Sequence, residues 1–136
     1  MPRYELLECV ERWIDDWNNH NLPAVMELFH QEAEFISWTG QCFKGKRTIQ
    51  RAWTNWFKNH GDFHFSIERL TLDELQHIVT MEWTLVWPSP EAGYENRQET
   101  RKGVDIIQFK NGLILSKKSF CQTVLLIDAD AVSMHL

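Results

Sequence analysis

One carboxylate is a candidate for acid/base chemistry because it interrupts an apolar run. Asp105 lies between Val104 and the pair Ile106–Ile107, in the middle of an expected strand. If its side chain points inward, tryptophan and isoleucine side chains surround the carboxyl group, and burial raises its pKa. Such a group is either a neutral hydrogen-bond donor or a base poised near pH 7. The alternative is that Asp105 points outward or pairs with a cation.

Three more chemically active side chains recur at every second position of the next expected strand. Lys117, Ser119 and Cys121 therefore share one face of that strand. An inward Lys117 beside Asp105 would lower the pKa of the carboxyl, which opposes the effect of burial. The two would form either an acid/base couple or a structural pair, and a solvated Lys117 is a further alternative. Cys121 has no His beside it in the pattern, which favours a small buried side chain over a nucleophile.

Two of the six histidines lie at a spacing that metal sites use. His60 and His64 are four residues apart, which on a helix would present two ligands together. Gly61 ends the helix between them, and the pattern offers no third ligand. Phosphate-binding glycine loops, nucleophile elbows and paired acidic motifs are also absent from the sequence. We therefore predict no metal site and no cofactor.

The aromatic content is the feature furthest from the average. The chain has seven Trp and eight Phe among 136 residues. Such side chains can build a core or line an apolar pocket. At helical and strand spacing, most are expected in the core and only a few at a cavity. The tryptophans are Trp13, Trp17, Trp38, Trp53, Trp56, Trp83 and Trp87.

Length and charge exclude several classes of protein. A chain of 136 residues favours one domain, expected to span residues 1–136. The formal net charge of -5 argues against a nucleic-acid partner, which needs a positive surface. No apolar run is long enough to span a membrane, and the start lacks the apolar stretch of a secretory signal. Three dispersed cysteines favour a reducing, cytoplasmic location.

The helices that must position these side chains are expected in the first half of the chain. Apolar residues recur every three or four positions over residues 3–18 and 47–58, and predict two amphipathic helices. Between them, Asn21 is expected to cap a short helix that holds Pro23 in its first turn.

The strands are expected mainly in the second half, where the apolar period changes to two. Asn111-Gly112 predicts a hairpin turn. The tail from Asp128 is weakly patterned and is expected to be loose. Helices packed on the concave side of a bent antiparallel sheet make an α+β cone with an interior cavity. The expected strands cover residues 33–38, 63–68, 78–87, 99–109 and 113–127.

The order and spacing of three segments resemble the nuclear transport factor 2-like superfamily. They read WNNHNLPAVMELFHQEAEFISWTG, GKRTIQRAWTNWF and GVDIIQFKNGLI. Within the superfamily, the chain is most similar to SnoaL-like proteins, named for polyketide cyclases, and to ketosteroid isomerases. The resemblance covers residues 5–122 and implies three N-terminal helices packed on a curved antiparallel sheet, with an interior pocket. This fold hosts isomerases, cyclases, dehydratases, hydrolases and non-catalytic binders, so it leaves the reaction open.

The resemblance implies roles for individual positions. Ketosteroid isomerases use a Tyr and an Asp as oxyanion donors and a second Asp as base; the matching positions here are Trp13, Asp105 and Ser37. Polyketide cyclases place an acid/base Asp where this chain has Ser119, and a pocket His where it has Asp105. Serine has no useful basicity near neutral pH, so neither mechanism carries over unchanged.

The resemblance also implies where the pocket lies and which residues surround it. Lys117 and Ser119 are expected on the same face as Asp105, on the neighbouring strand. The first helix is expected to wall a closed-ended pocket against the sheet. The predicted substrate-binding residues around the catalytic Asp105 are Trp13, Trp17, Ser37, Ile107, Lys117 and Ser119.

These observations favour a small-molecule-binding SnoaL-like protein that acts as an isomerase or cyclase. Its substrate would be apolar and contain a ring, and Asp105 would serve as acid/base or oxyanion partner. The alternative is a non-catalytic ligand carrier or interaction module, which the substituted positions Trp13, Ser37 and Ser119 favour. Relatives commonly pair through the convex sheet face, so a homodimer is expected, with neither nucleic acid nor membrane as partner.

Overall fold

Three helices form where the sequence carries one apolar face. The computed structural model describes residues 1–135, and its helices are α1 (Arg3–Asn18), α2 (Leu22–Glu27) and α3 (Lys46–Asn59). On α1 the buried residues include Trp13 and Trp17, one turn apart, which is the expected helical spacing. The Asn21 side chain accepts a hydrogen bond from the Ala24 N–H at 3.2 Å. The three predicted helices and the Asn21 cap are thus confirmed.

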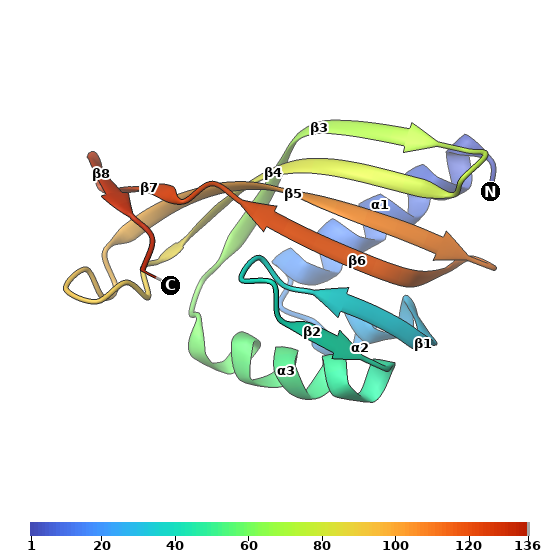
Figure 1. The fold of residues 1–136 in the computed structure, drawn as a ribbon, viewed down its shortest axis with the longest axis horizontal. Helices are drawn as coiled ribbons and strands as arrows, with labels where there is room; N and C mark the ends of the chain where they lie inside the picture. Colours follow the sequence, from blue (N-terminus) through green and yellow to red (C-terminus); the bar gives the residue numbers. More distant parts are fainter. Residues whose placement is uncertain (136) are drawn as a thin grey trace.

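Within residues 1–135, eight strands form one strongly curled sheet (Figure 1). Its main path has the order β2-β1-β6-β5-β4-β3, and β7 pairs with β5 and with β8. The strands are β1 (Phe29–Ile36), β2 (Cys42–Lys44), β3 (His64–Asp73), β4 (Ile78–Pro88), β5 (Gln98–Lys110), β6 (Leu113–Cys121), β7 (Val124–Ile127) and β8 (Asp130–Ser133).

The sheet is mixed, which corrects the expectation of a wholly antiparallel sheet. β1 runs parallel to β6, with Phe35 opposite Lys117, whereas the other pairs are antiparallel. Parallel neighbours require a long crossover, and here the chain passes through α3 and four strands before β6 returns beside β1. The expected hairpin at Asn111-Gly112 is confirmed and joins β5 to β6.

Several strand boundaries also differ from expectation. β3 extends to Asp73, beyond the expected residues 63–68. β1 begins at Phe29 and ends at Ile36, rather than covering residues 33–38. The single return strand expected over residues 113–127 is divided into β6 and β7. The tail after Asp128, expected to be loose, instead forms β8, where Val132 pairs with Leu125 of β7.

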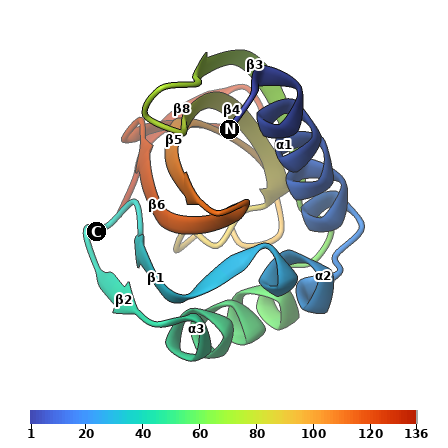
Figure 2. The ribbon, with the colours of Figure 1, turned by 90° about the vertical axis from the view of Figure 1, so that its right-hand side faces the viewer.

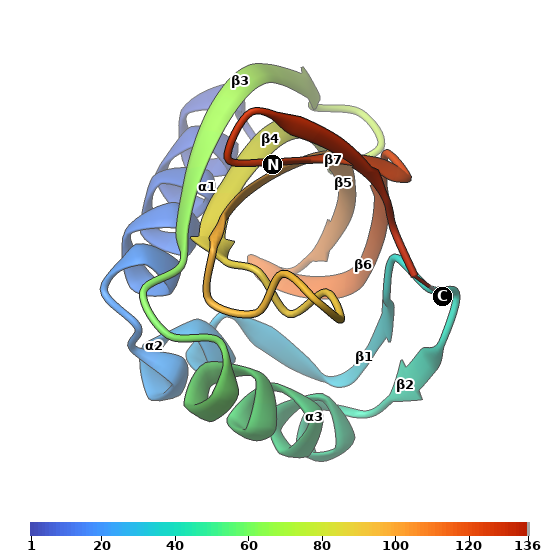
Figure 3. The same ribbon diagram turned by 90° about the vertical axis from the view of Figure 1, so that its left-hand side faces the viewer.

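The curled sheet and the helices enclose the core. Views along the long axis show the strands forming most of a ring, which α1 and α3 complete (Figures 2 and 3). Trp83, Leu85 and Trp87 alternate onto the concave face of β4 and are buried there. The predicted α+β architecture of helices on a curved sheet is therefore confirmed. Among the described residues, no helix combines the length and apolar character needed to cross a membrane.

Gly103 allows β4, β5 and β6 to approach closely beside the interior. A Cβ at this position would lie 2.2 Å from the Phe120 carbonyl oxygen and 2.4 Å from Cζ2 of Trp83. Real side chains do not tolerate such distances, so the Trp83 indole occupies the space that a side chain at position 103 would fill. Gly103 thereby fixes the position of one aromatic wall of the interior.

Candidate active site

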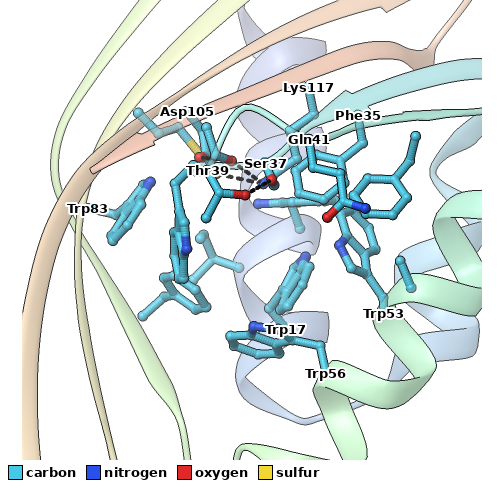
Figure 4. Close-up of a pocket in the computed structure, with 18 of the residues that line it drawn as sticks. Trp17, Phe35, Ser37, Thr39, Gln41, Trp53, Trp56, Trp83, Asp105 and Lys117 are labelled. Carbon is cyan, nitrogen blue, oxygen red and sulfur yellow. Dashed lines mark hydrogen bonds and ion pairs between the residues drawn. The ribbon is translucent and has the colours of Figure 1, made fainter. Parts of the chain in front are cut away.

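A cavity of about 200 Å³ lies between α1, α3 and the concave face of the sheet. The close-up shows aromatic side chains surrounding it, with a small group of polar side chains on the sheet side (Figure 4). Thr39 and Gln41 are exposed lining residues and mark where the cavity meets solvent. Six of the seven tryptophans line it, which corrects the expectation that only a few would: Trp13, Trp17, Trp38, Trp53, Trp56 and Trp83.

The aromatic wall is held by contacts between rings on different elements. Trp17 of α1 meets Trp53 of α3 at 5.0 Å between centroids and 72° between planes. Trp83 of β4 meets Phe65 of β3 at 5.6 Å and 84°. Edge-to-face arrangements of this kind are the preferred geometry of aromatic pairs. The Nε1–H groups of Trp17 and Trp83 are buried without a hydrogen-bond acceptor among the described residues.

Asp105, Ser119 and Lys117 form a buried hydrogen-bonded chain. Lys117 Nζ donates to Ser119 Oγ at 2.6 Å, and Ser119 Oγ donates to Asp105 Oδ1 at 2.7 Å. Lys117 Nζ also lies 3.4 Å from Asp105 Oδ2, and both side chains are only 8% exposed. The β5–β6 register places Asp105 directly opposite Ser119, and Lys117 follows two positions away on the same face.

The Lys117 ammonium is surrounded mainly by aromatic rings. Its Nζ lies 4.6 Å from the ring centre of Phe35, 5.6 Å from that of Trp53 and 5.8 Å from that of Trp13. Burial lowers the pKa of Lys117 below its usual value, and the nearby Asp105 carboxylate opposes this effect. The site therefore holds an amine whose proton is less firmly bound than that of a surface lysine.

Six of the seven residues predicted for the site line the cavity. They are Trp13, Trp17, Ser37, Asp105, Lys117 and Ser119. Ile107 is the exception: it is 1% exposed and packs in the hydrophobic core instead of lining the cavity. Its inward face was predicted correctly, but neighbouring core side chains cover it. The Ser37 and Thr39 hydroxyl groups are hydrogen-bonded, with 2.9 Å between their oxygens.

Sequence analysis did not single out several other lining residues, among them Phe35 and Gln41. Phe35 lies two positions before Ser37 in the expected strand 33–38, so strand alternation could have placed it on the same face. Gln41 lies in the turn before β2, and its place depends on the pairing of β1 with β2, which no local pattern predicts. Cys121 is half-buried outside the cavity lining, and its Sγ contacts Met134 Sδ at 3.9 Å.

A second buried polar cluster lies behind the cavity wall, and sequence reasoning missed it. Arg101 Nε donates to Glu99 Oε2 at 3.1 Å, and Nη2 lies 3.2 Å from Glu91 Oε1. Glu99 is fully buried and also accepts hydrogen bonds from Trp87 Nε1 and Ser89 Oγ. The Arg101 guanidinium lies 5.0 Å from the Trp38 ring centre, so this cluster supports one wall of the cavity.

His60 and His64 have a spacing used by metal sites, but no metal site was predicted there. His60 caps the end of α3 and contacts Trp56 and Trp87, each at 4.9 Å between ring centres, while His64 is exposed at the start of β3. Burial, and secondarily the Arg101 charge, lowers the pKa of His60. Within residues 1–135, no group of three or more His, Cys, Asp or Glu side chains is placed to hold a metal ion.

The family of the chain follows from its sequence match and agrees with this fold and cavity. Residues 10–117 match the family model of the SnoaL-like domain, so the chain belongs to the SnoaL-like domain family. No curated protein shows significant sequence similarity to the chain.

Solved structures with similar folds come from several bacteria. A candidate SnoaL-like polyketide cyclase from Jannaschia sp. CCS1 is 14% identical, with a TM-score of 0.74 over 88% of this chain and 86% of the other. A Catenulispora acidiphila protein with a ketosteroid isomerase-like fold, in complex with trimethylamine, is 17% identical, with a TM-score of 0.71 over 83% and 84%. A Methylobium petroleophilum protein with a cystatin-like fold is 19% identical, with a TM-score of 0.70 over 89% and 78%. At these identities the likeness is one of fold.

Proposed function

We propose that this protein binds a small, largely apolar, ring-containing molecule in the tryptophan-lined cavity. It acts on that molecule by acid/base chemistry, as an isomerase or cyclase of the SnoaL-like type. The observation that carries the proposal is the chain of Lys117, Ser119 and Asp105 buried at a largely aromatic cavity. Buried ionisable groups cost stability, and a cavity with a few convergent polar groups is the usual form of an active site.

The size and walls of the cavity indicate the kind of molecule. A cavity of about 150 Å³ is enough to bind benzene. A volume of about 200 Å³ therefore suits one substituted ring or a compact pair of rings. Flat aromatic walls stack well on such rings, and the exposed Thr39 and Gln41 leave a place for a polar substituent.

The three polar residues take different parts in this reaction. The Asp105 carboxylate removes a proton from the substrate and returns it at another atom. The Ser119 hydroxyl holds Asp105 in place, and the Lys117 ammonium balances negative charge that develops on a substrate oxygen. The similar folds of a candidate polyketide cyclase and of a ketosteroid isomerase-like protein support this class of chemistry.

A non-catalytic carrier of the same kind of molecule is the second candidate. Ser37 favours it, because a hydroxyl bonded to Thr39 stands where the resemblance expects the isomerase base. A carrier needs the aromatic walls but not a proton acceptor. The two functions therefore share their ligand and differ only in whether Asp105 exchanges a proton with it.

Proton exchange and binding can be measured separately with 1-indanone as the probe. Quenching of tryptophan fluorescence reports binding, and NMR in D₂O reports exchange of the protons beside the carbonyl. We expect binding with accelerated exchange, and a loss of roughly 10²–10⁴-fold in the exchange rate for Asp105→Asn. Asp62→Asn, which changes an exposed carboxylate outside the cavity, is the matched control. Binding without accelerated exchange would establish the carrier instead.

A further inference from the structure

The aromatic environment of Lys117 goes beyond what a counter-ion of Asp105 needs. We propose that Lys117 is a nucleophilic amine, which condenses with an aldehyde or ketone group of the bound molecule to form an imine. This rests on the proposed function, because the cavity must first admit the ring that carries the carbonyl. It narrows the substrate class from ring-containing molecules to carbonyl compounds, and for these it replaces the counter-charge role of the Lys117 ammonium with a covalent one.

The first argument is the position of the amine. Lys117 comes from the middle of β6 and lines the cavity, where Phe35, Trp53 and Trp13 surround its Nζ at 4.6–5.8 Å. Among the described residues, Asp105 is its only ion-pair partner. Lysines become nucleophiles when an apolar pocket removes water from the ammonium, and here burial lowers the pKa of Lys117. Apolar walls also keep water from hydrolysing an imine once it has formed.

The second argument is the direction of the hydrogen bonds. Lys117 Nζ donates to Ser119, and Ser119 donates to Asp105, so every donor in the chain points from the amine to the carboxylate. A proton passed along this path leaves a free amine at Lys117 and a neutral carboxyl at Asp105. Ser119 gives one proton and receives another, so its own state is unchanged. The amine is thus released without contact with solvent.

The bonds and charges balance without a further reactant. The Nζ lone pair forms a C–N bond to the carbonyl carbon while the C=O π pair moves to oxygen, and a proton passes from nitrogen to that oxygen. The neutral Asp105 carboxyl then protonates the hydroxyl, which leaves as water while the nitrogen lone pair completes C=N. The product is a protonated imine beside the Asp105 carboxylate, so the charge pair of the resting site is restored.

Lys118 provides a matched control within the same strand. It is the next residue, but it points to the outer face of β6 and is exposed. It has the same chemistry and the same backbone neighbours, without the aromatic surroundings. A difference in reactivity between the two lysines therefore reports the effect of the cavity on the amine, and not an effect of the strand.

The experiment traps the imine with benzaldehyde and cyanoborohydride at neutral pH, and then maps the benzylated lysine by mass spectrometry of peptides. We expect modification of Lys117 to exceed that of Lys118 clearly, because burial lowers the pKa of Lys117 and so raises its fraction of free amine. Lys117→Arg should abolish this adduct, while Lys118→Arg should leave it. The comparison within the wild-type protein stands even if Lys117→Arg does not fold.

Benzyl alcohol separates this proposal from the proposed function, because it has the same ring without a carbonyl. Its binding is measured by tryptophan fluorescence. If benzyl alcohol binds and competes with benzaldehyde while Lys117 is modified no faster than Lys118, the imine proposal is overturned and the binding function stands. If neither probe binds and Lys117 is not selectively modified, both fail.

Discussion

Asp105 and Lys117 are both buried, and each compensates the charge of the other. Replacing either one alone should therefore destabilise the fold. Their charged atoms lie 3.4 Å apart at 8% exposure. Removing one partner of a buried pair typically costs about 3–5 kcal/mol, because the other charge is left without compensation. The pair therefore couples the stability of the fold to the integrity of the site.

This coupling predicts a non-additive pair of substitutions. Asp105→Asn should lower the free energy of unfolding by about 3 kcal/mol, since Lys117 would lose its counter-ion. The double variant Asp105→Asn with Lys117→Met should recover part of that loss, because no buried charge remains. Urea denaturation at neutral pH measures all three proteins. Additive losses in the double variant would show that the two charges do not depend on each other.

His60 predicts a specific dependence of stability on pH. Its pKa is lowered by burial and then by Arg101, whereas the unfolded chain binds the proton near pH 6.5. As pH falls through about 6.5 toward the folded pKa, the unfolded state takes up the proton first, and the wild type loses stability. His60→Gln should not show this loss. Thermal unfolding between about pH 8 and pH 5 tests it, with the exposed His64→Gln as control; parallel curves for wild type and His60→Gln would contradict it.

At the scale of elements, the close packing of β4, β5 and β6 depends on Gly103. Gly103→Ala should lower stability by about 2 kcal/mol or more, because the added methyl would overlap the Phe120 carbonyl oxygen and the Trp83 ring. It should also change the near-ultraviolet circular dichroism, since Trp83 must move. Gly93→Ala is the comparison: its Cβ would meet nothing within 4 Å, and its φ of +86° alone should cost about 1 kcal/mol. An equal cost for the two would refute the packing argument.

Elements with a regular apolar period were predictable, and those formed by distant pairing were not. α1, α3 and β4 each bury one face, and their apolar patterns repeat without interruption. β1 has a register irregularity between Phe29 and Glu34, which breaks the alternation of apolar and polar residues. The start of the strand at Phe29 was therefore not predictable from the pattern. β8 is mostly exposed and has no apolar alternation, because pairing with β7 rather than burial holds it.

The same distinction applies to the site. Alternation along β5 and β6, together with the family resemblance, places Asp105, Ser119 and Lys117 on one face, and the structure brings them together. The buried cluster around Arg101 and Glu99 was missed, because charged residues in a strand ordinarily indicate a solvated face. The Trp38 and Trp87 rings, together with Ser89 and Glu91 from the segment between β4 and β5, contact these two side chains and bury them.

At the scale of the molecule, the outer face of the sheet exposes apolar side chains that a second copy of this chain could cover. Phe120 is 52% exposed, Leu126 49% and Ile106 36%. We propose that this face forms the homodimer interface, so sedimentation at micromolar concentration should give twice the 16.2 kDa of one chain. Phe120→Asp should shift the protein to monomer without weakening binding in the cavity. A wild type that sediments only at 16.2 kDa would rule the dimer out.

The parallel pairing of β1 with β6 bears on how the protein is made. During synthesis, α1, α3 and β1 leave the ribosome before β6 has been made. The strands that bury Trp13, Trp17 and Trp53 are then still missing. Contacts so distant in sequence close slowly, and uncovered aromatic faces attract other chains in the meantime. Because β6 must be made before it can pair with β1, we expect the nascent chain to bind chaperones until the cavity has closed.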